Sequence, residues 1–563
     1  MKRKPIIVAN DAVNDSETTG NLPPGWTSSR LGDLTTRSEY GTSTKCDYSG
    51  RSMPVLRIPN IARGEIDTSD LKRAIADMPL GEGDELQPGD MLICRTNGSL
   101  SLLGKAAVIR NAFESPHSFA SYLLRFRFLE RDVLPRWIHL FLSSAGRRFI
   151  ERRAASSAGQ HNISLSTLNS MPLPLAPPNE QRRIVEKIEE LFSDLEAGVA
   201  ALTRARANLK RYRASVLKAA VEGSLTAEWR ARQAPSPRRG EGRGEGFEPA
   251  SQLLERILTE RRRQWEADQL TKFTAAGKQP PKNWQAKYAE PERADLTDVP
   301  PIPEGWTICS LDQLTTTITS GSRDWSQYYG DGTGTFIMAQ NVRPGKLDLA
   351  YRQPVNPPAD DRDRARSQVV EGDLLVTIVG ANTGDVCRVD GHYPEHYVCQ
   401  SVALMRPVLS LMSPFVEAYF VSHENGQRQF RRYIYGQGRP HLGFDQLRVT
   451  PILLPPLAEQ KEIVTEVAEK LSQIEAAEVA IDHSLRRAAR LRQSILKQAF
   501  EGKLVPQHPT DEPASSLLER INHERKVGQV GDNSPKRSRR IRTSGEIQEP
   551  ATASPKPLSG KGD

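Results

Sequence analysis

The segments EQRRIVEKIEELF (Glu180–Phe192) and EQKEIVTEVAEKL (Glu459–Leu471) decide how this 563-residue chain folds, because they are copies of one another. They lie in longer copies, Pro172–Leu225 and Pro451–Leu504, which align without a gap at an offset of 279 residues and are identical at 21 of 54 positions. Solenoid repeats have periods of only about 20–50 residues. The long period therefore indicates a duplicated unit that consists of a domain and a helix.

Apolar residues recur every seven positions in both copies, and a strict seven-residue repeat is typical of a left-handed coiled coil. Proline-rich segments precede each predicted helix, and Gly223 or Gly502 follows it, as expected for helix start and stop signals. The predicted seam consists of Ile188, Leu195, Leu202, Leu209 and Val216 in the first helix, and of Val467, Ile474, Ile481, Ala488 and Ile495 in the second.

Charge polarity predicts how the two helices pair. Glu180–Glu196 carries six acidic and three basic residues, whereas Arg204–Glu222 carries six basic and one acidic residue. The second helix repeats this order, so antiparallel pairing places each acidic half opposite a basic half. The polarity also suits each helix dipole, but that effect fades beyond the terminal turns. We therefore expect antiparallel helices with one domain at each end, in a dumbbell of approximate two-fold symmetry.

A globular region of equal length precedes each helix. LPPGW (Leu22–Trp26) opens the first region and IPEGW (Ile302–Trp306) opens the second, and 154 and 153 residues separate each tryptophan from its helix glutamate. Short β-prone runs bounded by Gly, Asp and Asn predict strands and turns, and amphipathic helices follow them. We expect mixed α/β (α+β) domains. The expected boundaries are a flexible leader at 1–20, domain 1 at 21–175, helix 1 at 176–225, a linker with a short helix at 226–300, domain 2 at 301–455, helix 2 at 456–505, and a short helix followed by a disordered basic tail at 506–563.

Composition narrows the class of protein. A net charge of +8 and a pI near 9.1 fit a nucleic-acid partner without demonstrating one. The five cysteines are scattered, with no C-x-x-C pair, so we expect neither a disulfide framework nor a metal site, and reduced thiols are typical of the cytoplasm. The sequence contains no apolar run of about 18 residues, which is the length that would predict a membrane span.

Two motifs that superficially suggest catalysis fail in detail. Asn356-Pro357-Pro358 resembles the loop with which amino-methyltransferases hold a flipped base, but Ala359 follows it and provides no ring for stacking. Gly98–Lys105 resembles a phosphate-binding loop with one residue too many, and Ala106 occupies the position of the required Ser or Thr. We therefore expect no catalytic residues and no cofactor bound by this chain.

The combination of L-P-x-G-W, a proline stretch, E-Q-x-x-I-V and a long helix ending in L-K-x-A-x-E-G-x-L resembles the specificity subunit of type I restriction-modification systems. The resemblance covers roughly Leu22–Leu504. It implies two target-recognition domains that each read half of a split site in double-stranded DNA, and a helical spacer that docks two methyltransferase subunits. Two restriction subunits would complete the nuclease. It also implies that S-adenosylmethionine, ATP and Mg²⁺ bind the partners, which supply adenine methylation and ATP-dependent cleavage. The long linker Thr226–Pro300 and the basic tail depart from the simplest family pattern.

Polar residues on loops that interrupt the strand pattern are candidates for base reading. Arg suits guanine and Asn or Gln suits adenine, because both pairings can be bidentate. Capping, turn or phosphate-contact roles remain open for each of them. The candidates are Arg95, Thr96, Asn97, Gln160, His161 and Asn162 in domain 1, and Asn382, Thr383, Gln437, Arg439 and His441 in domain 2. A self-contained methyltransferase or nuclease, and a coiled-coil scaffold without a DNA role, are the competing hypotheses.

Overall fold

The computed structural model describes residues 22–78, 81, 83–157, 159–233, 248–436 and 438–531. Its contacts divide the chain into two units: unit 1 is Met1–Glu196 with Ala488–Asp563, and unit 2 is Ala197–Arg487. Each unit thus combines one globular region with parts of both long helices. The predicted leader, the basic end of the tail and Gln437 lie outside the described residues.

The core of unit 1 is an antiparallel sheet with the strand order β2-β10-β6-β8. Every residue of β6 and β10 is buried, because helices and a second sheet cover both faces of this sheet. Its strands are β2 (Thr35–Tyr40), β10 (Leu123–Phe128), β6 (Met91–Cys94) and β8 (Ala106–Val108). A second sheet contains β3 (Cys46–Asp47), β5 (Lys72–Ala74), β4 (Pro54–Leu56) and β9 (Ser118–Phe119). The helices are α1 (Ile58–Ile61), the 3-10 turn η2 (Leu31–Leu34), α2 (Val133–Leu142), α3 (Ala145–Arg153), α4 (Leu165–Asn169) and α14 (Ala514–Gly531).

Unit 2 repeats this plan with the sheet order β15-β23-β20-β21. These strands are β15 (Thr315–Ser320), β23 (Val402–Pro407), β20 (Leu374–Thr377) and β21 (Val386–Arg388). Further strands are β16 (Tyr329–Ile337), β17 (Val342–Arg343), β18 (Lys346–Leu347), β19 (Gln353–Val355) and β22 (His396–Val398). The helices are α8 (Leu311–Leu314), α9 (Arg362–Ser367), α10 (Ser413–Val421), α11 (Gly426–Tyr433) and α12 (Phe444–Val449), with the 3-10 turns η4 (Trp325–Tyr328) and η5 (Ser410–Met412). The linker contributes α6 (Ala227–Gln233), α7 (Ala250–Ala275) and the 3-10 turn η3 (Trp284–Lys287). The predicted mixed α/β class is confirmed.

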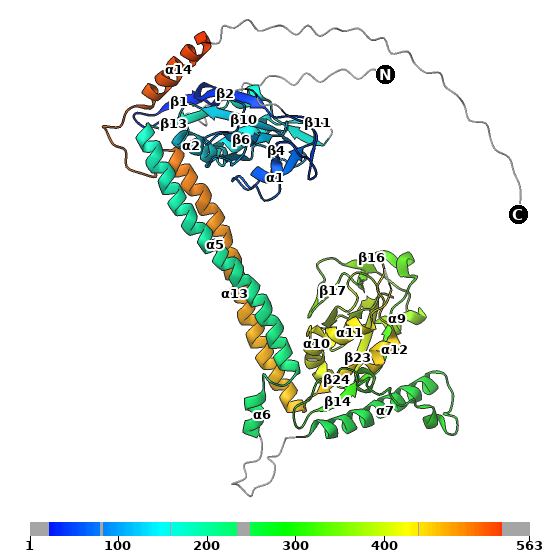
Figure 1. The fold of residues 1–563 in the computed structure, drawn as a ribbon. Coiled ribbons are helices and arrows are strands. Elements are labelled where there is room, and N and C mark those ends of the chain that lie inside the picture. The colour runs from blue at the N-terminus through cyan, green and yellow to red at the C-terminus, as the bar shows by residue number, and fades with distance from the viewer. Residues whose placement is uncertain are drawn as a thin grey trace, which may run out of the picture. The chain divides into compact units, whose positions relative to one another are not determined.

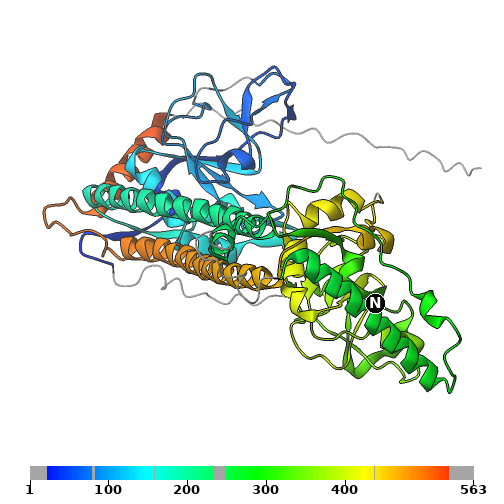
Figure 2. The ribbon, with the colours of Figure 1, turned by 90° about the horizontal axis from the view of Figure 1, so that it is seen from below.

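Two helices of 44 residues, α5 (Pro178–Val221) and α13 (Leu457–Phe500), run side by side (Figures 1 and 2). In unit 1, the first turns of α5 share a core with the last turns of α13, including Ile188 and Ile495. In unit 2, the last turns of α5 share a core with the first turns of α13, including Val216 and Val467. The helices are therefore antiparallel, as their charge polarity predicted.

The ion pairs between the helices fit the same arrangement. Arg206 pairs with Asp482 at 3.3 Å, and Arg213 lies 3.6 Å from Glu475 and 3.5 Å from Glu478. These basic residues come from the second half of α5, whereas Glu475 and Glu478 lie in the first half of α13 and Asp482 lies just past its midpoint. Of the ten predicted seam residues, four are half-buried, and the buried ones are Ile188, Val216, Val467, Ile474, Ile481 and Ile495.

The repeated sequence landmarks join each domain to the start of its helix. Trp26 Nε1 donates a hydrogen bond to Glu180 Oε2 at 3.0 Å, and Trp306 Nε1 donates to Glu459 Oε2 at 2.9 Å. A two-stranded ladder lies beside each junction and pairs the segment after the tryptophan with the segment before the helix. These strands are β1 (Thr27–Arg30) with β13 (Pro172–Leu175), and β14 (Thr307–Ser310) with β24 (Pro451–Leu454). The motif spacing therefore reflects a closed domain whose two ends meet.

The glycines that end the long helices are needed for close packing. Gly223 has a φ of +76°, and a Cβ atom there would lie 2.9 Å from Trp306 Cζ2. Gly502 has a φ of +66°, and a Cβ atom would lie 2.5 Å from Pro23 Cγ. Each helix end thus packs on the opening motif of a domain, and both the left-handed backbone and the lack of space favour glycine.

In the part of the chain that the structure describes, no helix is both long enough and apolar enough to cross a bilayer. Across the same residues, no cluster of three or more His, Cys, Asp or Glu side chains is placed to hold a metal ion. All five cysteines are free thiols, and four of them are buried.

Candidate nucleic-acid interfaces

In unit 1, a small three-stranded sheet brings together candidates that are about 65 residues apart in sequence. It has the order β11-β12-β7, with β11 (Ala155–Ser157), β12 (Gln160–Asn162) and β7 (Thr96–Asn97). In the β12–β7 ladder, His161 lies opposite Asn97 and Asn162 lies opposite Thr96. The tight turn at Gly159, which has a φ of +77°, connects β11 to β12. Five of the six candidates in this domain therefore lie on paired strands of one sheet.

The side chains on this sheet differ in how available they are. Gln160 is exposed, and His161 and Asn162 are partly exposed. The Asn97 side-chain oxygen accepts a hydrogen bond from the Ser99 amide at 2.7 Å, so it shapes the turn after β7. The Thr96 hydroxyl is buried. Gln160, His161 and Asn162 are therefore the most accessible of these five candidates.

Arg95 precedes β7 and lies against an aromatic ring. Its guanidinium carbon is 4.9 Å from the centroid of the Tyr40 ring, and its Nη1 donates to the Ser121 carbonyl at 3.3 Å. The Arg95 carbonyl accepts the Ile163 amide at 2.9 Å, which joins this position to the end of β12. Arg95 is thus fixed at the edge of the same small sheet.

In unit 2, the segment from Tyr435 to His441 forms the corresponding hairpin. The Tyr435 amide donates to the His441 carbonyl at 3.0 Å, and the His441 amide donates to the Tyr435 carbonyl at 2.8 Å. His441 also forms a bridge with Val379, at the position where Asn162 pairs with Thr96 in unit 1. Arg439 is exposed on this hairpin.

The remaining candidates in unit 2 support the loop beside the hairpin. The Thr383 hydroxyl donates to the Gly380 carbonyl at 2.7 Å and lies 3.1 Å from the Pro440 carbonyl. The Asn382 carbonyl accepts the Asp385 amide at 3.0 Å. The structure therefore brings Asn382, Thr383, Arg439 and His441 to one region, with Thr383 fixing the loop to the hairpin.

The two regions share a backbone plan and differ in side chains. The Leu442 amide donates to the Ile378 carbonyl at 2.9 Å, as the Ile163 amide does to the Arg95 carbonyl. A buried isoleucine in unit 2 thus occupies the position of Arg95 in unit 1. A common platform with different polar groups would distinguish two different base sequences.

Basic helices lead into both hairpins. α3 ends in Arg152 and Arg153 immediately before β11, and α11 carries Arg431 and Arg432 immediately before the hairpin of unit 2. Arg432 forms an ion pair with Asp295 at 2.5 Å, whereas Arg431 donates to the His423 carbonyl at 2.8 Å. Cations beside a reading surface provide the phosphate contacts that orient a protein on a duplex.

Comparison with known proteins finds relatives of one kind. No model of a protein family matches the chain. The chain is 31% identical over 229 residues to the EcoKI type I restriction enzyme specificity subunit of Escherichia coli strain K12, a match that covers 40% of this chain and 48% of that protein. It is 24% identical over 525 residues to the StySPI specificity subunit of Salmonella potsdam, covering 90% of this chain and 97% of that protein. The EcoBI specificity subunit of Escherichia coli is 26% identical over 382 residues, covering 66% and 68%.

The chain is thus similar over most of its length to specificity subunits of type I restriction enzymes. A solved chain from a study of complex assembly and conformational transition of the type I R-M system matches this chain with a TM-score of 0.57. The match has 18% sequence identity and covers 86% of this chain and 99% of that chain, and it supports the fold.

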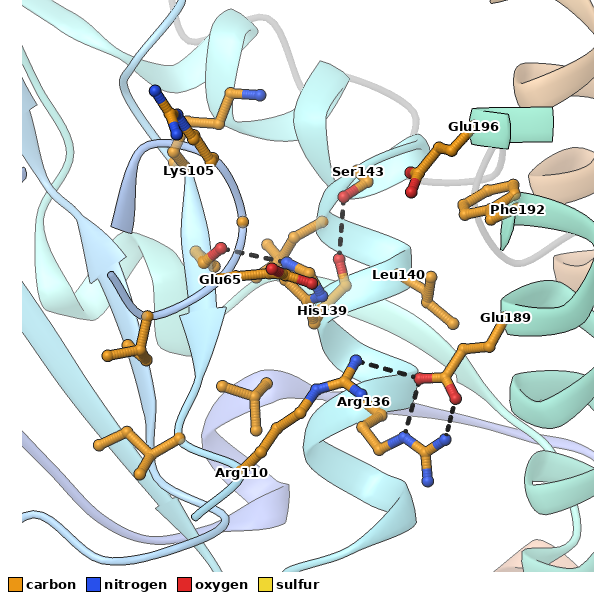
Figure 3. Close-up of a pocket in the computed structure, with 18 of the residues that line it drawn as sticks. Glu65, Lys105, Arg110, Arg136, His139, Leu140, Ser143, Glu189, Phe192 and Glu196 are labelled. Atoms are coloured by element: carbon orange, nitrogen blue, oxygen red, sulfur yellow. Dashed lines mark hydrogen bonds and ion pairs between the residues drawn. The ribbon is translucent and has the colours of Figure 1, made fainter. Parts of the chain in front are cut away.

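Unit 1 also contains a cavity of about 1130 Å³ beside β8, α2 and α5 (Figure 3). Arg136 Nε donates to Glu189 Oε1 at 3.1 Å, and Arg110 donates to the same oxygen at 3.2 Å. His139 Nε2 lies 3.1 Å from the Ala106 carbonyl, and burial lowers the pKa of His139 to about 4. The histidine is therefore neutral and donates to the carbonyl. These contacts tie α2 to α5 and β8, and they do not form an acid–base pair.

Sequence reasoning missed Tyr40 and Tyr435, which are 49% and 58% exposed beside the candidate readers. Tyr435 directly precedes the glycine-rich segment Gly436–Gly438, so an aromatic residue at a predicted turn was an available signal. Tyr40 carries no comparable local signal, because its proximity to Arg95 depends on the pairing of distant strands.

Proposed function

We propose that this specificity subunit recognises a bipartite, asymmetric site in double-stranded DNA, with the domain of unit 1 reading one half and the domain of unit 2 reading the other. The observation that carries the proposal is the repeated platform, a strand or loop at 96–97 or 379–383 bridged to a hairpin at 155–162 or 435–441. Identical readers would imply a symmetric site, whereas these two platforms carry different polar groups.

The long helices support the second part of the proposal, which is that they set the distance between the half-sites. Both α5 and α13 are continuous over 44 residues, and each helix contributes to the cores of both units. Equivalent faces of B-DNA recur after about 34–36 Å. We expect the half-site centres to lie about one helical turn apart.

The duplicated helices also provide two equivalent surfaces for two methyltransferase subunits, and two restriction subunits would complete the assembly. Methylation of a base inside a duplex requires its extrusion into a catalytic pocket. The specificity subunit is non-catalytic, so S-adenosylmethionine, ATP and Mg²⁺ belong to these partners. We also expect the complex in the cytoplasm, where its DNA substrate would be.

Binding measurements on the purified subunit, alone and reconstituted with its methyltransferase partner, test this function against the alternatives. The reconstituted complex should bind its target duplex more tightly than a scrambled duplex, and the affinity should fall with salt as phosphate contacts are screened. Calorimetry on the subunit alone should show no heat of S-adenosylmethionine binding. Such heat would indicate a self-contained enzyme, and salt-insensitive or absent duplex binding by the complex would indicate a scaffold.

A further inference from the structure

Each candidate reading surface contains one planar polar group that lies next to the ring of an exposed tyrosine. In unit 1, the guanidinium of Arg95 lies 4.9 Å from the Tyr40 ring centroid. In unit 2, the ring centroids of Tyr435 and His441 are 5.9 Å apart, with 23° between the ring planes. Both tyrosines are too exposed to be core residues, so burial of apolar area does not explain their placement.

The contact in unit 1 spans three strands of the central sheet. Tyr40 ends β2, and Arg95 follows β6, while β10 lies between these two strands. The Arg95 amide donates to the Tyr122 carbonyl at 3.0 Å, and the guanidinium reaches back across the end of β10 to the Ser121 carbonyl. Tyr40 therefore lies where it limits the side-chain rotamers of Arg95.

The positive charge of Arg95 is not neutralised by an ion pair within the described residues. Within the residues that the structure describes, no carboxylate lies within ion-pair distance of its guanidinium. Nη1 donates to the Ser121 carbonyl and Nε is buried without a hydrogen-bond partner, so a base contact would use the terminal nitrogens of the guanidinium. A ring beside the guanidinium restricts the direction in which its planar fork points, and bidentate recognition of guanine O6 and N7 requires a defined direction.

The contact in unit 2 depends on the hairpin. Tyr435 and His441 lie opposite each other and exchange both backbone hydrogen bonds, which sets their side chains next to one another. Gly436 and Gly438, with φ values of +96° and +86°, allow the tight turn between them. The imidazole is therefore oriented by a ring from the facing strand and by its own backbone pairing with Val379.

The two pairs do not occupy equivalent positions in the duplicated fold. The residue that ends β15, the counterpart of β2, is Ser320, so unit 2 has no tyrosine at the position of Tyr40. The counterpart of Arg95 is Ile378, as the shared backbone hydrogen bond shows. The same device, a planar polar group stacked on an exposed tyrosine, thus occurs twice at different positions. Inheritance of one ancestral contact does not explain this.

We propose that Tyr40 and Tyr435 are positioning residues that hold Arg95 and His441 in fixed orientations for base contacts, one in each half-site. Arg95 would read a guanine, and His441 would contact a purine N7 or another major-groove acceptor. The inference rests on the proposed DNA-recognition function and extends it to the residues that set specificity. Loss of a ring should relax base preference at one position of one half-site without lowering the affinity for all sequences.

Competition binding by the reconstituted complex tests this, with duplexes in which each base of each half-site is varied in turn. Tyr40→Leu keeps apolar area but removes the aromatic face, and it should reduce the preference for one guanine by about three- to ten-fold. Tyr40→Phe should retain the preference. Neither variant should alter the half-site read by unit 2. Tyr435→Leu and Tyr435→Phe should give the reciprocal result in the other half-site.

Control variants separate positioning from a general loss of exposed aromatic surface. Tyr48 in unit 1 and Tyr351 in unit 2 are 69% and 59% exposed, and neither contacts a candidate reader. Tyr48 also lies under a lysine, which makes it a cation–π control. Substitution of either residue by leucine should leave the base preference in both half-sites unchanged, and a change as large as that of Tyr40→Leu would contradict the proposal.

The arginine and histidine variants distinguish failure of this inference from failure of the proposed reading surface. If Arg95→Ala relaxes the preference and Tyr40→Leu does not, the positioning role is wrong while the reading surface stands. If Arg95→Ala and His441→Ala both leave every base preference intact, the reading surface itself is misplaced. A uniform loss of affinity for all duplexes by Tyr40→Leu would assign the tyrosine to phosphate contact, which also overturns positioning.

Discussion

At the residue scale, the junctions between domain and helix use the same buried glutamate in different surroundings. Glu459 accepts hydrogen bonds from Trp306, Thr226 and Arg230, with the Thr226 hydroxyl at 2.7 Å. Glu180 accepts one from Trp26, and its other oxygen is buried without a hydrogen-bond partner in the described structure. The equivalent glutamate therefore accepts more hydrogen bonds at the Glu459 junction than at the Glu180 junction.

This difference predicts opposite results for one substitution made at two sites. Glu459→Gln should lower the free energy of unfolding by about 1.5–3 kcal/mol, because charge-assisted hydrogen bonds are lost from a buried acceptor. Glu180→Gln should be neutral or stabilising near pH 7. Thermal and denaturant unfolding of the full chain provides the measurement. A larger loss for Glu180→Gln than for Glu459→Gln would contradict this account of the junctions.

The pH dependence of Glu180 follows from its burial, which raises the pKa of its carboxyl above the ordinary value of 4.5. The folded state therefore binds this proton more readily than the unfolded state. The resulting stability is fully present below pH 4.5 and is lost as the pH rises through the folded-state pKa. The free energy of unfolding of Glu180→Gln minus that of wild type should therefore increase with pH across this window. A difference that does not vary with pH would show that the two states share one pKa.

Local sequence patterns supplied the candidate readers, but they did not predict which candidates lie next to one another in the fold. Thr96 and Asn162 interrupt strand-like runs, which made them candidates, yet their pairing depends on a ladder between segments 66 residues apart. The exposure of Tyr40 is equally non-local, because it depends on which strands flank β10. Gly–polar turns are visible in sequence, whereas the neighbours of a turn are set by the tertiary fold.

At the element scale, the helix pair is held mainly by its apolar seam. Ile474 on α13 is buried at 2% exposure, whereas Val479 on the same helix is 69% exposed. Ile474→Ala should cost about 2–4 kcal/mol, because it removes buried carbon and leaves a cavity. Val479→Ala should change the free energy of unfolding by less than about 0.5 kcal/mol. Chemical denaturation of both variants is the measurement. If both lose the same free energy of unfolding, the apolar seam is not the source of the stability of the helix pair.

The ion pairs along the helices should contribute less than the seam. Arg213 lies near both Glu475 and Glu478, but its two partners retain much of their exposure to solvent. Arg213→Ala should therefore cost about 0–1 kcal/mol, and salt should reduce that cost further. A salt-independent loss above about 2 kcal/mol in the same denaturation experiment would show that these pairs hold the helices together.

The helices were predictable because their signals are local. A seven-residue repeat, prolines at the start, glycine at the end and a reversal of charge sufficed to predict both α5 and α13 and their antiparallel pairing. The short strands were harder, because strands of two or three residues such as β17 and β18 form only where a partner edge is present. Their existence depends on contacts that a sequence window does not contain.

At the scale of the whole molecule, the proposed role of the helices as a spacer predicts a change of DNA target. Four residues inserted between Ala200 and Ala201 should shift the seam of α5 against α13 and alter the gap between the two half-sites. The recognised bases should stay the same, because neither hairpin is touched. Methylated motifs of the variant complex provide the measurement. An unchanged gap at full efficiency would show that the helices do not set the spacing.

We propose that this chain determines the DNA site at which its partners act. Methylome sequencing of a host with the partner methyltransferase, with and without this gene, tests it most directly. We predict an asymmetric split motif with methylated adenine that disappears on deletion and returns when the gene is restored. A methylome that is unchanged by the deletion would contradict the claim.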